Sequence, residues 1–73
     1  MSTSAYVRST GITAENVIDG PSVYFHSAFY YIAPGDVLYS RIDLNKNVKG
    51  GKYCGETEGL SGYNYGTACE TVS

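Results

Sequence analysis

One histidine and two cysteines are the residues of this chain best suited to metal or nucleophile chemistry. Cys54 and Cys69 are far apart in the chain and His26 is distant from both, so the close C-x-x-C or H-x-x-x-H spacing of a zinc site is absent. A catalytic His26 would need a nucleophile and an orienting acid, and no motif beside it supplies either. We therefore expect no metal and no cofactor, with His26 as a partnered histidine in a core or an interface.

Two sets of charged side chains are further candidate sites. Glu56 and Glu58 alternate along an expected strand and point the same way, as a calcium-binding or acid–base pair would, but this pattern is also typical of a solvated strand face. Lys46, Lys49 and Lys52 lie in the polar stretch NKNVKGGK, which predicts a surface loop or, alternatively, a patch that contacts phosphate. No glycine pattern matches a nucleotide-binding loop. We expect the protein not to be an enzyme.

The composition indicates a small domain with few aliphatic side chains. The chain has 73 residues, a net charge of −2 and an apolar fraction of 42% that depends on eight tyrosines, which suit interfaces because each ring carries a hydroxyl that needs a partner. The negative charge makes nucleic acid an unlikely partner. A signal-peptide pattern and a run of about 20 apolar residues are both absent, so we expect synthesis in the cytoplasm and no membrane insertion.

The most apolar stretch is SVYFHSAFYYIA at 22–33. A strand's alternation puts apolar side chains on both of its faces, and the sequence leaves open which face is the core. Because a strand of a small domain normally buries one face only, this stretch needs cover that so short a chain can hardly supply. We predict that neighbouring subunits or a second copy cover it. The side chains expected at this contact are Tyr24, His26, Tyr30, Ile32, Tyr63 and Tyr65.

Turn signals divide the chain into about five short strands. Residues 5–10 alternate as a first strand. Within 12–20, either 14–18 form a single helical turn or, as we favour, 16–18 form a second short strand. The sequence APGD at 33–36 predicts a type II turn, with glycine at the position that requires positive φ. This turn is expected to join 22–33 to a one-sided strand at 36–45 as an antiparallel hairpin.

The glycine-rich C-terminal part predicts a second hairpin with its tip at Ser61-Gly62. In that register Cys54 lies opposite Cys69, within disulfide reach. A strict two-residue turn makes them a hydrogen-bonded pair, which fits a disulfide imperfectly, so a disulfide and two free thiols both remain open. Together the elements predict a single all-β domain over 1–73, a small barrel or sandwich with its core in 1–48 and a hairpin arm at 49–73.

The segment VIDGPSVYFHSAFYYIAPGDVLYSRIDL, followed by GLSGYNYGTACETVS, resembles small phage virion proteins such as head-decoration or tail-associated subunits. The resemblance implies a non-enzymatic structural subunit, present in many copies in a viral particle and buried by its neighbours. Two other functions remain open. One is a small inhibitor or adaptor of a host enzyme, encoded by a mobile element, as anti-CRISPR proteins are. The other is a module that binds nucleic acid or glycan by stacking on tyrosines.

Overall fold

Alternating side chains and glycine or proline turns produce seven strands and no helix in the computed structural model, which describes residues 2–44 and 47–73. The strands are β1 (Ser2–Arg8), β2 (Ile12–Asp19), β3 (Tyr24–His26), β4 (Tyr30–Ile32), β5 (Val37–Asp43), β6 (Gly51–Gly59) and β7 (Asn64–Val72). Each recorded pairing between them is antiparallel. The all-β prediction is therefore confirmed, with more strands than the five expected.

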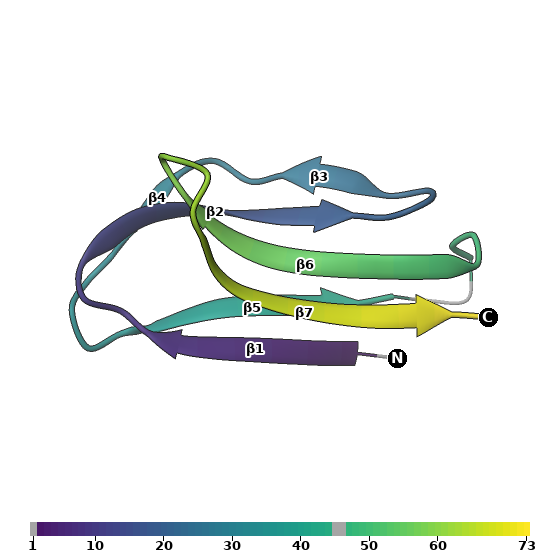
Figure 1. The fold of residues 1–73 in the computed structure, drawn as a ribbon, viewed down its shortest axis with the longest axis horizontal. Helices are drawn as coiled ribbons and strands as arrows, with labels where there is room; N and C mark the ends of the chain where they lie inside the picture. The colour runs from purple at the N-terminus through teal and green to yellow at the C-terminus, as the bar shows by residue number, and fades with distance from the viewer. Residues whose placement is uncertain (1, 45–46) are drawn as a thin grey trace.

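The strands form two sheets that pack against each other as an unclosed barrel (Figure 1). In the larger sheet the order is β3, β2, β6 and β7, and β4 also pairs with β2, in line with β3. The smaller sheet consists of β1 and β5. β1 lies beside β7, and β5 lies behind β6 and β7. The barrel stays open because, among the described strands, no pairing joins β5 to β3 or β1 to β7.

β5 has the one-sided character that its sequence predicts, since its buried residues Leu38, Ser40 and Ile42 alternate with exposed ones. The type II turn before it is also confirmed. The amide of Asp36 donates to the carbonyl of Ala33 at 3.1 Å, and Gly35 has a φ of 89°.

The predicted hairpin between 22–33 and 36–45 is wrong, because β5 pairs with β1. Three hydrogen bonds favour the pairing of β5 with β1, because they attach the turn to Ser9, the residue that follows β1. The amide of Ser9 donates to the carbonyl of Asp36, the amide of Gly35 donates to the carbonyl of Ser9, and the hydroxyl of Ser9 donates to the carbonyl of Ile32. The chain leaving the turn is therefore directed along β1.

The stretch 22–33 forms two short edge strands, β3 and β4, rather than one central strand. Between them the amide of Ser27 donates to the carbonyl of Asn16, while the amide of Asn16 donates to the hydroxyl of Ser27. The hydroxyl of Ser27 thus takes the place of a main-chain carbonyl as the acceptor for the amide of Asn16, and the strand pairing with β2 is interrupted over 27–29. Ile32 is the member of this stretch that enters the core, beside Ala14 and Leu38.

The β6–β7 hairpin has the predicted register, with Cys54 opposite Cys69, and the two form a disulfide. Its loop is longer than the strict two-residue turn. The amide of Gly59 donates to the carbonyl of Tyr63, and Gly62 adopts a φ of 82°. A register shift after Thr57 changes the alternation of wide and narrow pairs. The Cα separation of the cysteines, 4.1 Å, is accordingly that of a non-hydrogen-bonded pair.

The division into a core at 1–48 and a projecting arm at 49–73 is wrong, because β6 lies between β2 and β7 in the larger sheet. The inner face of β6 carries glycines, which leave room for β5 to approach. A Cβ at Gly55 would lie 2.8 Å from Cγ1 of Ile42. Because β5 lies this close to β6, the β6–β7 hairpin is covered although it has few apolar side chains of its own.

Tyr53, one of the eight tyrosines, is fully buried at the inner face of β6, although the composition indicates that tyrosines suit interfaces. Its hydroxyl donates to the carbonyl of Lys49 and shares a hydrogen bond with the hydroxyl of Ser22. Its ring leaves no room for a side chain at Gly20. This tyrosine therefore joins the β2–β3 turn to the start of β6.

Candidate functional site

Five aromatic rings are exposed along the edge of the larger sheet formed by β3, β4 and the residues between them. We call this surface the aromatic edge; its members, between 40% and 69% exposed, are Tyr24, Phe25, Phe29, Tyr30 and Tyr31. Within the described residues, β3 and β4 pair on one side only, with β2. The stretch 22–33 contains no Lys, Arg, Asp or Glu. The aromatic edge is therefore an uncharged strand edge with large apolar side chains.

The residues predicted for a protein contact divide into two groups. Tyr24, Tyr30 and Tyr63 are exposed, as that prediction requires. Ile32 does not belong to the surface, because it is buried. Tyr65 is partly buried and packs against the core, with its ring 4.7 Å from that of Tyr63.

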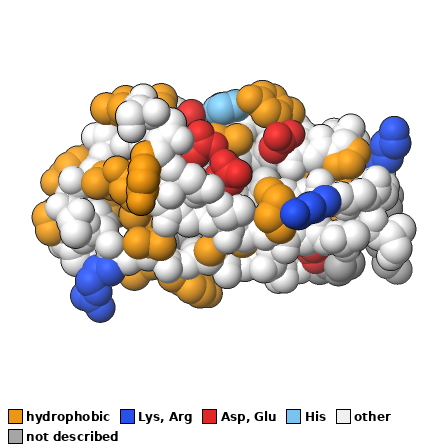
Figure 2. Space-filling model, in the orientation of Figure 1, with side chains coloured by type: hydrophobic (Ala, Val, Ile, Leu, Met, Phe, Trp, Pro, Cys, Tyr) orange, Lys and Arg blue, Asp and Glu red, His pale blue; other side chains and the backbone are white. Residues whose placement is uncertain are grey.

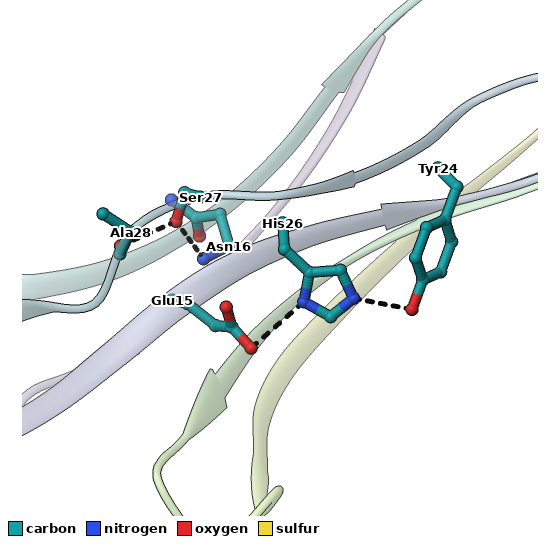
Figure 3. Close-up of polar contacts among 6 residues, drawn as sticks. All are labelled: Glu15, Asn16, Tyr24, His26, Ser27 and Ala28. Atoms are coloured by element: carbon teal, nitrogen blue, oxygen red, sulfur yellow. Dashed lines mark hydrogen bonds and ion pairs between the residues drawn. The ribbon is translucent and has the colours of Figure 1, made fainter.

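His26 stands on the outer face of the larger sheet, the face turned away from β1 and β5, between two hydrogen-bonding partners (Figure 3). Its Nδ1 lies 3.2 Å from Oε1 of Glu15, and its Nε2 lies 2.6 Å from the hydroxyl of Tyr24. An acid, an imidazole and a hydroxyl in line are the elements of nucleophilic catalysis. In this protein the histidine and the hydroxyl are exposed, where water competes for the same groups, while the carboxylate of Glu15 is mostly buried. Their evident effect is to fix the orientation of Tyr24 and His26 at the aromatic edge.

The sequence does not identify Glu15 as the partner of His26, because the contact depends on the pairing of β2 with β3. In this register Val17 lies opposite His26, and Glu15 is on the same face two residues away. A second contact of this kind fixes Tyr30, whose hydroxyl accepts a hydrogen bond from the side-chain amide of Asn16 at 2.9 Å. β2 thus positions Tyr30 directly through Asn16, and Tyr24 indirectly through Glu15 and His26.

Carboxylates gather beside His26 on the same outer face, where Figure 2 shows acidic side chains next to the histidine. Glu15 lies opposite Glu58, and Val17 opposite Glu56. The pKa of Glu56 is raised above its usual value, first by a hydrogen bond with Glu58, then by burial, and also by repulsion from Glu58 and Asp19. Among the residues that the structure describes, no three His, Cys, Asp or Glu side chains are arranged to hold a metal ion.

The predicted lysine cluster is described in part. Lys46 lies outside the described residues, whereas Lys49 and Lys52 are both exposed, with Lys52 on β6. The main chain of Lys49 is held in place, because its amide donates to Ser22 and its carbonyl accepts from Tyr53. The loop is thus anchored to the β2–β3 turn.

An open cleft of about 320 Å³ lies between β5 and the β2–β3 pair, where the barrel is not closed. Its lining includes Ile18, Phe25, Ser40 and Gly55. The hydroxyl of Ser40 is buried and has no hydrogen-bonding partner among the described residues. Phe25 joins this cleft to the aromatic edge.

A separate aromatic pair lies on the outer face of the smaller sheet, where the rings of Tyr6 and Tyr39 are 5.1 Å apart. The pKa of Tyr39 is lowered, first by a hydrogen bond with Ser4 and also by Tyr6 and Arg41. Because Tyr6 and Tyr39 are exposed but lie on strands that pair with each other, variants at these positions can serve as controls for variants of the aromatic edge.

Comparisons with protein families, with curated proteins and with solved structures found no match to this chain. In the parts of the chain that the structure describes, no helix is long and apolar enough to cross a membrane. The fold and the surface together define the class: an all-β protein with an uncharged aromatic sheet edge.

Proposed function

We propose that this protein is a non-enzymatic structural subunit of a multi-copy assembly, namely a phage particle, in which the aromatic edge contacts neighbouring subunits. The observation that supports the proposal is the aromatic edge itself. At about 200 Å² per ring, its exposed fractions correspond to roughly 500 Å² of ring surface. A standard interface buries about 800 Å² on each partner, so the five rings supply more than half of that area.

A protein neighbour fits this edge better than nucleic acid or glycan. A free strand edge presents unpaired main-chain amides and carbonyls, which another strand satisfies. Nucleic acid needs lysine or arginine around the stacking rings, but the groups beside these rings are carboxylates, including Glu15 and Glu58. The chemistry of the surroundings therefore favours a protein surface.

The proposed location is a particle that is assembled in the cytoplasm and then released. The Cys54–Cys69 disulfide supports a mature form that resides in oxidising surroundings, because a reducing cytosol keeps most thiols free. Disulfide formation after release would stabilise the subunit where the particle must persist.

Sedimentation velocity over a series of protein concentrations tests the proposal. We expect the wild type to sediment well above the 7.9 kDa of a single chain. Tyr31→Lys places a charge on the aromatic edge and should lower the degree of association, because a buried unpaired charge is costly. The matched control is Tyr6→Lys, since Tyr6 is 63% exposed and Tyr31 is 65% exposed.

Two results would count against this function. A wild type that remains monomeric at every concentration would remove the multi-copy proposal and favour the inhibitor or adaptor alternative. Equal loss of association in Tyr31→Lys and Tyr6→Lys would show that the aromatic edge has no special part in assembly.

A further inference from the structure

We infer that two copies of this chain pair edge to edge, with β3 of one copy antiparallel to β3 of the other about a two-fold axis at Phe25. The inference rests on the proposed function, because it specifies one contact through which copies assemble. It names both the strand that accepts the neighbour and the register of the pairing.

Among the strands of the described residues, four edges have no recorded pairing: those of β1, β7, β5 and of β3 with β4. β1 and β7 lie side by side and block each other, so the edges open to another chain belong to β3 with β4 and to β5. The edge at β5 carries an ion pair between Arg41 and Asp43, whose side chains are 2.8 Å apart. Charged side chains are a common means of preventing strand pairing, and the stretch 22–33 has none. β3 is therefore the edge open to another strand.

A second copy can supply the main-chain partners that the β3 edge lacks, because two identical edges of this kind do not repel each other. In a two-fold interface each residue faces its counterpart across the axis, so a charged edge would meet like charges, whereas this one does not. The nearest carboxylates are on β2, including Glu15. The two β2 strands would be three strand spacings apart, or about 14 Å. That separation exceeds the screening length of about 8 Å at physiological salt, so repulsion between the two acidic faces is weak.

The register follows from the position of the axis. Phe25 lies opposite Phe25 of the second copy, and Tyr24 lies opposite His26 of the second copy. Tyr24 and His26 already contact each other within one copy, with ring centroids 4.9 Å apart, so the pairing brings four rings together as a two-by-two cluster on the outer face. On the inner face, the second Phe25 ring adds apolar cover beside the open cleft that the first one lines.

Cysteine cross-linking tests this register. Phe25→Cys places two thiols across the axis, at the separation of directly opposite strand residues, which is within disulfide reach. Under a mild redox buffer we expect a covalent dimer as the main product on a non-reducing gel. Tyr39→Cys, on the outer face of the other sheet, is the control and should remain largely monomeric. Mass spectrometry of the linked peptides separates this bond from exchange with Cys54 and Cys69.

A second pair of variants keeps Phe25 intact, in case its loss weakens association. An equal mixture of Tyr24→Cys and His26→Cys should form several-fold more heterodimer than either variant forms homodimer, because these positions face each other only across copies. If the wild type associates but neither experiment gives these products, the edge-to-edge pairing is wrong while the multi-copy function stands. A monomeric wild type overturns both.

Discussion

Replacement of Gly20 tests the packing that anchors the β2–β3 turn beside the aromatic edge. A Cβ at this position would lie 2.0 Å from Cδ2 of Tyr53 and 2.5 Å from its Cε2, far inside van der Waals contact. The ring has little freedom to move aside, because it is fully buried and its hydroxyl is bonded to Ser22 and Lys49. Overpacking of a core typically costs about 1–3 kcal/mol. We expect Gly20→Ala to reach the upper end, about 3 kcal/mol.

The assay is urea unfolding followed by far-UV circular dichroism, with the free energy of unfolding extrapolated to water. A loss of this size is large for a domain whose total stability is on the order of 5–15 kcal/mol. The matched control is Gly66→Ala. Its Cβ would meet Cγ2 of Val7 at 3.4 Å, an ordinary contact, so the free energy should change by less than about 1 kcal/mol.

A double-mutant cycle identifies the cause of the loss. In a Tyr53→Leu background the ring that the new Cβ would meet is absent, so Gly20→Ala should cost less than about 1 kcal/mol. The difference between the two backgrounds is the coupling energy expected of residues in contact. Two results would refute the reasoning: a loss under about 0.5 kcal/mol in the wild-type background, or an equal loss in both backgrounds.

Two further predictions concern the outer face of the β6–β7 hairpin. Replacing Cys54 and Cys69 together by serine should lower the free energy of unfolding by about 3 kcal/mol, because the disulfide closes a loop with a sequence separation of 15; a reductant should lower the melting temperature of the wild type and not of the variant. Because its neighbours raise the pKa of Glu56, the native state loses stability as the pH rises through that raised pKa. Glu56→Gln removes this loss, so the melting temperature of the variant relative to wild type should be higher at pH 7 than at about pH 4; an equal difference at both pH values would contradict this cause.

Local patterns in the sequence predict several elements correctly. The alternation of Leu38, Ser40 and Ile42 gives β5 its buried face, and the sequence APGD gives the type II turn. The hairpin tip near Gly62 sets the register that brings Cys54 to Cys69. These features depend on residues close in the chain or on one count outward from a turn, so they can be derived without knowledge of the rest of the fold.

The stretch 22–33 shows where local patterns are insufficient. Its apolar content marks it as unusual, and five of its rings are indeed exposed in the single chain. Its place at the edge of the sheet, however, depends on Ser27, which interrupts the ladder with β2, and on Ser9, which directs β5 away from it to β1. Each effect comes from two or three hydrogen bonds between segments that are not adjacent in the sequence, and no periodicity encodes them.

The sequence by itself determined the strand-forming segments, the turns and the disulfide register, because backbone preference and side-chain alternation act between near neighbours. The tertiary structure decided which strands pair, which tyrosine is buried and which acid meets His26. Tyr53 and Glu15 take their roles from Gly20 and from the β2–β3 register. Such roles depend on the space and the hydrogen-bonding partners that distant segments provide, and these exist only once the sheets have packed.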